Sequence, residues 1–242
     1  IGCALVVCSG ASLIAAESEA AREPNRPKVA GELRLMLRER RETAPKSGKY
    51  EAVEREAIWK ASETAIIICD VWDDIYCKMA AQRIGVMAPV MNRAVSAARE
   101  RGVMVIHAPS GTMEVYADTP FRRRMQQAKP VEPPAPIAGW CYVDPDREPP
   151  LPLDVTNPCD DPVPPEPVRR YNREHPALDI VAFDGVSDDG KEIYNFCRQE
   201  GIKNIAIMGV HTNMCVLGRS FGIRQMTRLG MNVALVRDLT DA

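Results

Sequence analysis

Three residues with reactive side chains follow apolar runs of the chain. The run TAIIIC ends at Asp70, the run VMVI ends at His107, and the run NIAIM leads through the loop GVHTNM to Cys215. A thiol can attack a carbonyl carbon, and a carboxylate can take its proton and later return it to a leaving amine. These residue types suggest nucleophilic hydrolysis if the fold brings them together.

Each reactive residue also has a structural interpretation. Cys215 could be a core thiol, which is what we expect for Cys69 and Cys197 in their apolar runs. Asp70 could cap a helix or bind the loop that follows it. Spacing within the chain leaves both interpretations open.

No cofactor motif is recognisable. The three histidines, His107, His175 and His211, do not have metal-ligand spacing, and the cysteines form no CxxC pair. The chain also contains neither a GxGxxG nor a P-loop pattern. We therefore expect no metal and no other cofactor.

The intervening segments predict a parallel α/β sheet with helices on both faces. Continuous apolar runs are typical of strands buried on both faces, and they alternate here with helical stripes. Ligands of such sheets bind outside the carboxyl ends of the strands, where the three reactive residues would meet. The expected strands are 64–70, 103–106, 204–208 and 233–236, and the expected helices are 87–101, 189–200 and 214–229.

The helix expected over 214–229 would place Cys215 in its first turn. The positive end of a helix dipole lowers the pKa of a thiol and favours the nucleophilic thiolate. The preceding loop, GVHTNMC, could direct backbone N–H groups at a developing oxyanion.

The segments IIICDVWDD, VMVIHAPS, NIAIMGVHTNMCV and MNVALVRDLTDA, in this order, resemble the isochorismatase-like (nicotinamidase-related) cysteine hydrolases. The most specific of them is GVHTNMCV. The resemblance implies a three-layer α/β/α fold with a six-stranded parallel sheet, truncated at the C-terminus before a final helix and strand. It also makes Cys215 the nucleophile and Asp70 the acid/base residue. It implies a cis Val210–His211 bond and an oxyanion hole of amides near His211 and Cys215.

One part of the family's triad is missing. The family carries a lysine at a position that corresponds to Ala182, and no lysine lies between Lys129 and Lys191. Arg173 or His175 could supply the cation instead. Otherwise the activity is altered or lost.

The resemblance implies a hydrolase that cleaves a small amide or related C–N bond through a cysteine thioester. The alternatives are a catalytically impaired binding module of the same fold and an isochorismatase-type hydrolase. The nicotinamidase metal pattern is absent, which argues against nicotinamide as substrate. We expect the substrate pocket to be lined by Trp72, His107, Asn213, Arg173 and His175.

Two segments extend the expected hydrolase domain, which spans 62–242. Residues 1–20 begin with the uncharged run IGCALVVCSGASLIAA, typical of a secretory signal and too short for a membrane span. An apolar element of the fold is the alternative, so the protein is expected to be exported (periplasmic) or else cytoplasmic. Residues 21–61 form an extension in which Leu33, Leu35 and Leu37 alternate as in an edge strand, although a short helix would also fit.

Residues 130–167 hold 13 of the 20 prolines and form one long, stiff loop. We interpret this insertion as a lid or a subunit-contact arm, and a disordered insertion is the alternative. Trp140 should dock it on the body of the domain. In an exported protein Cys141 could pair with Cys159 across it.

The net charge of −2 gives no indication of a nucleic-acid partner, and the short arginine clusters are typical of solvated surface. The expected partner is a small-molecule substrate. The resemblance adds an expected homo-oligomer.

Overall fold

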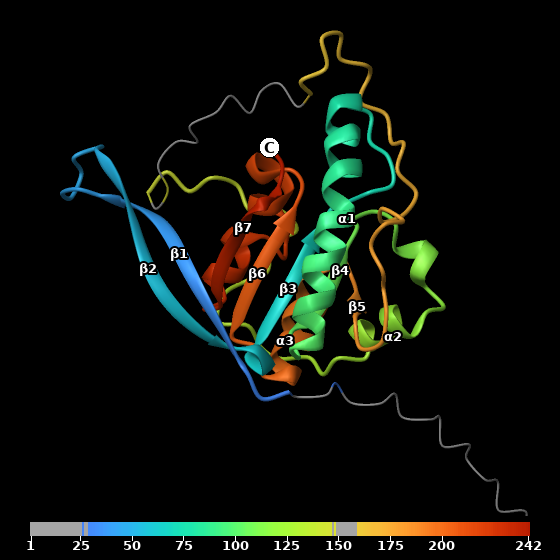
Figure 1. Ribbon diagram of the computed structural model, residues 1–242, viewed down its shortest axis with the longest axis horizontal. Coiled ribbons are helices and arrows are strands. Elements are labelled where there is room, and N and C mark those ends of the chain that lie inside the picture. The colour runs from blue at the N-terminus through green and yellow to red at the C-terminus, as the bar shows by residue number, and fades with distance from the viewer. Residues whose placement is uncertain (1–25, 27–28, 147, 149–158) are drawn as a thin grey trace, which may run out of the picture.

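The computed structural model describes residues 26, 29–146, 148 and 159–242. Its centre is a five-stranded parallel sheet in the order β5-β4-β3-β6-β7 (Figure 1). The strands are β3 (Thr64–Cys69), β4 (Met104–Ala108), β5 (Gly185–Val186), β6 (Asn204–Gly209) and β7 (Asn232–Thr240). The predicted parallel α/β sheet is confirmed, with five strands among the described residues rather than six.

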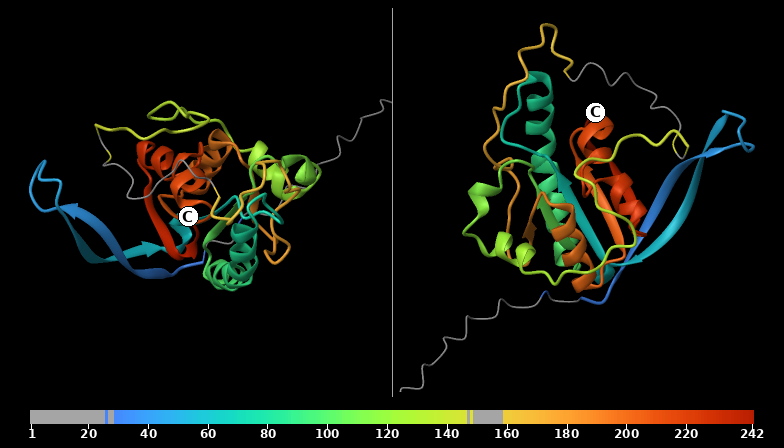
Figure 2. Two further views of the ribbon diagram at one scale, coloured as in Figure 1. Left: turned by 90° about the horizontal axis from the view of Figure 1, so that it is seen from above. Right: turned by 180° about the vertical axis from the view of Figure 1, so that it is seen from behind.

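Helices cover both faces of the sheet (Figure 2). Ile66 and Ile68 of β3 pack with the face covered by α1 (Lys78–Glu100). Ala65 and Ile67 pack into the opposite layer. That layer contains α2 (Pro120–Gln126), α3 (Gly190–Glu200) and α4 (Ile223–Arg228). Because successive strand residues point to opposite faces, one apolar run supplies both cores.

The single helix predicted over 214–229 is wrong. The chain forms a π-helical turn at Thr212–Val216 and begins α4 only at Ile223. Two glycines separate these elements. A Cβ atom on Gly218 would lie 2.6 Å from the Trp140 ring, and one on Gly222 would lie 2.8 Å from the Val216 carbonyl oxygen. The stretch between the π-helical turn and α4 is therefore packed too closely for a side chain at either glycine.

A β-hairpin projects from the body of the domain (Figure 1). It consists of β1 (Glu32–Glu42) and β2 (Tyr50–Lys60), which pair antiparallel along their whole length. The strand predicted around Leu33, Leu35 and Leu37 is confirmed, and the short helix is excluded. The expected signal segment, 1–20, lies outside the described residues.

The proline-rich segment is docked on the domain, as Trp140 predicted. The Cys141 N–H donates to the Gly218 carbonyl oxygen at 2.6 Å. The Arg224 guanidinium pairs with the Glu148 carboxylate at 2.7 Å. The first contact lies between the π-helical turn and α4 and the second lies on α4, so the described part of the segment covers the chain just beyond Cys215.

The predicted Cys141–Cys159 disulfide is wrong, because Cys159 is bonded to Cys77. Cys77 precedes α1 on one face of the sheet. Cys141 is buried on the other face, where its thiol contacts the Gln225 side chain of α4 at 3.1 Å. The two cysteines of the insertion are therefore separated by the sheet.

Candidate active site

Asp70 stands directly after β3, with a backbone φ of +54° and a side chain without solvent exposure. Aspartate adopts this left-handed conformation more readily than most residues, and strained backbone is concentrated at functional sites. The Ser110 N–H donates to Asp70 Oδ1 at 2.9 Å. The Arg219 Nε donates to Asp70 Oδ2 at 2.9 Å. Both oxygens of a buried carboxylate are thus fixed in place.

Cys215 lies in the π-helical turn after β6 and is 8% exposed. Strands β3 and β6 are neighbours, and Cys69 pairs with Gly209 at their carboxyl ends. This register brings the loop of Cys215 beside Asp70. The charges of Asp70 and Arg219 both act on the Cys215 thiol, because Asp70 raises its pKa and Arg219 lowers it. A nucleophile, a carboxylate and a cation therefore form one almost buried cluster.

The thiol of Cys215 is protonated at rest. Burial, followed by the charge of Asp70, raises its pKa to about 12, and the nearby Arg219 counteracts this only in part. The pKa was expected to fall because of a helix N-terminus, and this expectation is wrong: burial and a neighbouring anion outweigh the short π-helical turn. The proton must leave during attack, and Asp70 is the adjacent acceptor.

Arg219 was missed by the sequence analysis. Its spacing of four residues from Cys215 was the available signal, because such residues share one side of a helix. The substitutes proposed for the missing lysine lie elsewhere. Arg173 is exposed, and its backbone bonds with Asp73. The His175 Nδ1 accepts the Ala177 N–H.

The loop between β6 and Cys215 is tied to the end of β7. The Val210–His211 peptide bond is cis, as the resemblance predicted. Both the N–H and the hydroxyl of Thr212 donate to the Asp241 carbonyl oxygen, at 2.7 and 2.9 Å. The Asn213 Oδ1 is buried and has no hydrogen-bond partner among the described residues. An unpartnered buried acceptor beside the nucleophile is available to a ligand.

Trp72 forms a wall close to Asp70. Its ring stacks on Tyr171 with centroids 4.3 Å apart, and its indole N–H donates to the Ser110 carbonyl oxygen at 3.1 Å. Ser110 is also the residue whose amide holds Asp70. The structure thus places Trp72 in the shell around the carboxylate.

His107 lies behind the site rather than in a substrate pocket. Its side chain has no solvent exposure, and its Nδ1 lies 2.7 Å from Glu174 Oε2. Its Nε2 lies 3.3 Å from Asp184 Oδ2, which also pairs with Arg99 at 2.8 Å. Burial alone would lower the pKa of His107, but the two carboxylates raise it to about 9. His107 is therefore a cation that joins β4 to two loops.

We expect this cation to make stability depend on pH. The pKa of His107 is near 6.5 in the unfolded chain and about 9 in the folded protein. The stabilisation of the folded protein by its charge is therefore complete below pH 6.5 and is lost as the pH rises through 9. The full effect is roughly 3 kcal/mol. His107→Gln should lower the free energy of unfolding at pH 6 and flatten its decline between pH 6.5 and 9.5, measured by urea titration. His175→Gln is the control, and an unchanged slope in His107→Gln would contradict this assignment.

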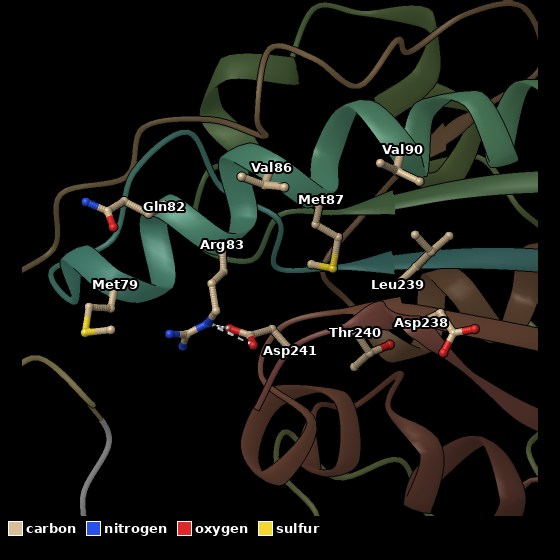
Figure 3. A pocket seen from close by; sticks show the side chains of 10 residues that line it. All are labelled: Met79, Gln82, Arg83, Val86, Met87, Val90, Asp238, Leu239, Thr240 and Asp241. Carbon is tan, nitrogen blue, oxygen red and sulfur yellow. Dashed lines mark hydrogen bonds and ion pairs between the residues drawn. The ribbon is translucent and has the colours of Figure 1, made fainter.

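A groove lies beside the site, between α1 and the end of β7 (Figure 3). Its volume is about 540 Å³, and its walls include Met79, Val86 and Leu239. At one end Arg83 pairs with Asp241 at 2.8 Å, the residue whose backbone holds Thr212. The Asp241 backbone joins this end of the groove to the nucleophile loop.

Among the described residues, one group of side chains has the spacing of a metal site: Cys77, Cys159 and Asp161. Its ligand atoms are already occupied. The two sulfurs are bonded to each other, and the Asp161 carboxylate accepts the N–H groups of Lys78 and Met79 at the start of α1. Within the described chain, no helix is long and apolar enough to cross a membrane.

No protein-family model and no curated protein matches the chain. Solved structures with a similar fold include an isochorismatase family protein from Burkholderia thailandensis. The sequence identity is 18%, the match covers 74% of this chain and 79% of that chain, and the TM-score is 0.42. Another is a cysteine hydrolase from Pseudomonas syringae pv. phaseolicola, with 17% identity, coverage of 75% and 74%, and a TM-score of 0.42. At this level of similarity the site rests on the chain's own geometry.

Proposed function

We propose that the protein is a cysteine hydrolase that cleaves a small amide or a related C–N bond. Cys215 is the nucleophile and Asp70 is the acid/base residue. The observation that carries this proposal is the cluster of thiol, carboxylate and guanidinium at the carboxyl ends of β3 and β6.

In the first half of the reaction, the Cys215 sulfur bonds to the carbonyl carbon while its proton passes to Asp70. The C–N bond then breaks, and the amine leaves with the proton held by Asp70. A thioester remains on Cys215. In the second half Asp70 takes a proton from water, and the resulting hydroxide attacks the thioester. The acid leaves, and the thiol regains its proton from Asp70.

The backbone amides near His211 and Cys215 are proposed to stabilise the oxyanion of each tetrahedral intermediate. The ties between Thr212 and Asp241 support this role, because they fix the loop that carries both amides. Preorganised donors of this kind need no reorganisation during the reaction.

The cluster favours an active enzyme over an impaired binding module. A binding module has no need of a buried carboxylate in contact with a buried thiol, an arrangement that is costly unless it is used. The intact nucleophile likewise supports thioester chemistry over hydrolysis of the isochorismatase type. We further propose that 62–242 form the hydrolase domain. The Cys77–Cys159 disulfide supports export, since disulfides persist in oxidising compartments.

Cys215→Ala should lower hydrolysis across a panel of small amides by about 10³-fold or more, as loss of a nucleophile does in other hydrolases. Wild-type protein quenched in acid during turnover should carry the acyl mass on the peptide that contains Cys215. Cys197→Ala is the matched control, because Cys197 is another free buried cysteine and lies in α3, outside the Asp70 cluster. Hydrolysis that survives in Cys215→Ala would overturn the proposal.

A further inference from the structure

The cation beside Asp70 comes from the chain segment that follows the nucleophile. Arg219 lies four residues beyond Cys215, in the break between the π-helical turn and α4. Its Nε is 2.9 Å from Asp70 Oδ2, and its side chain is 28% exposed. Trp140, from the proline-rich segment, lies on its other side.

We propose that Arg219 is a catalytic residue that supplies the triad's cation, and that Trp140 is the positioning residue that holds it against Asp70. This inference rests on the proposed function and deepens it. It makes Trp140, in the described part of the proline-rich segment, part of the active site.

Arg219 supplies the positive charge that offsets the negative charges of the cluster. Before the proton passes, the negative charge of Asp70 opposes the negative charge that develops on the Cys215 sulfur in an almost buried site. The guanidinium pairs with Asp70, and the charges of Asp70 and Cys215 both raise the pKa of Arg219 and so favour its charged form. A guanidinium has five N–H donors in a rigid fork, so it can bond to Asp70 through Nε and still present donors to sulfur.

Trp140 fixes the other side of this guanidinium. The Arg219 Cζ lies 5.7 Å from the centre of the indole ring, within the range of a cation–π interaction. The backbones of Trp140 and Arg219 also form an isolated antiparallel β-bridge. A Cβ atom on Gly218 would lie 2.6 Å from the indole, so the ring fills the space that a larger residue would need.

Trp140 is in turn anchored by its own segment. The Ala138 N–H donates to Gln225 Oε1 at 3.1 Å, and the Arg224 guanidinium donates to the Cys141 carbonyl oxygen at 3.2 Å. Glu148 adds an ion pair to the same arginine. These contacts lie on both sides of Trp140 in the sequence. Its ring is consequently held by the fold, and Arg219 is held by the ring.

The first test uses Arg219→Met and Arg219→Lys, with Arg237→Met, an exposed arginine of β7, as the control. The readouts are kcat and the rate of Cys215 alkylation by iodoacetamide from pH 7 to 10, resolved by peptide mass spectrometry. Loss of the cation raises the pKa of the thiol further. Cys215 of Arg219→Met should therefore be alkylated at about one tenth of the wild-type rate, or more slowly still. Arg219→Lys should recover part of both kcat and alkylation.

The second test uses Trp140→Ala and Trp140→Phe, with the exposed neighbour Tyr142→Ala as the control. Loss of the ring should reduce kcat and alkylation roughly three- to thirtyfold with little change in KM, corresponding to a cation–π contribution. Trp140→Phe keeps a ring and should retain most of the activity. A structural role alone would change the stability but not the alkylation profile.

The outcomes separate this inference from the proposed function. Equal alkylation profiles for wild type, Arg219→Met and Trp140→Ala overturn the inference, even if hydrolysis depends on Cys215. Slower alkylation in both variants with recovery in Arg219→Lys supports it. This readout needs no substrate. A failure of wild type to hydrolyse any amide would therefore count against the proposed function alone.

Discussion

Replacing Asp70 with asparagine should abolish hydrolysis and at the same time make Cys215 easier to alkylate. Asparagine keeps the size of the side chain and an oxygen that can accept the Ser110 N–H. It cannot accept the thiol proton during attack or return a proton to the leaving amine. Loss of a general acid/base lowers the rate by roughly 10²- to 10⁴-fold.

The expected increase in alkylation follows from the charges around the thiol. Asp70 raises the pKa of Cys215, and Arg219 lowers it. Without the carboxylate, the guanidinium faces the sulfur with no anion to neutralise it. The thiolate fraction at a given pH should therefore rise, whereas Arg219→Met should lower it. Opposite effects of two neighbouring substitutions on one thiol are difficult to explain by unfolding.

The measurement is the rate of modification of the Cys215 peptide from pH 6 to 10, beside the rate of amide hydrolysis in the same samples. Asp238→Asn is the control, since this aspartate is 82% exposed and pairs only with Arg237 among the described residues. Hydrolysis that persists in Asp70→Asn would show that another group accepts the thiol proton and returns it to the leaving amine. The assigned role of Asp70 would then be wrong.

Asp70 and Cys215 could be predicted because each follows a strand with an unambiguous pattern. The β-branched run before Asp70 and the run before the GVHTNM loop are fully or largely buried strands. Parallel neighbours end at one edge, so the strand pattern predicted that the two residues lie close together, although the same reasoning wrongly placed His107 with them. Strand β5 was missed because it has only two residues, Gly185 and Val186, and no apolar run.

Arg219 could not be predicted with the same confidence, because its role depends on contacts between distant segments. The spacing of four residues places Arg219 on the side of Cys215 in a continuous helix but does not show that the two act together, and the structure has a break at Gly218, against which Trp140 packs. The pairing of Cys77 with Cys159 has the same origin, since Cys159, 82 positions further along the chain, reaches the start of α1 only in the folded protein. Local patterns specify strands, whereas long-range packing decides which side chains meet.

Gly209→Ala should disrupt the active-site edge more than any other single methyl group we can add. Gly209 ends β6 with a φ of +122°, a conformation that side chains rarely adopt. A Cβ atom there would lie 2.0 Å from the Cys69 carbonyl oxygen. That oxygen accepts the Val210 N–H at 2.9 Å, and the contact joins β3, which leads to Asp70, to the loop of Cys215.

Relief of this clash requires β3 and β6 to separate where their ends carry the catalytic residues. Gly209→Ala should therefore lower the free energy of unfolding by roughly 3–5 kcal/mol, as strain and overpacking do together, and eliminate hydrolysis in the protein that remains folded. The measurement is urea unfolding combined with the amide assay. Gly201→Ala is the matched control, because Gly201 also has a positive φ, of 73°, but open space around it. It should cost only about 1 kcal/mol and keep full activity. Equal losses in the two variants would mean that backbone strain alone, and not the contact between the ends of β3 and β6, sets the geometry of the site.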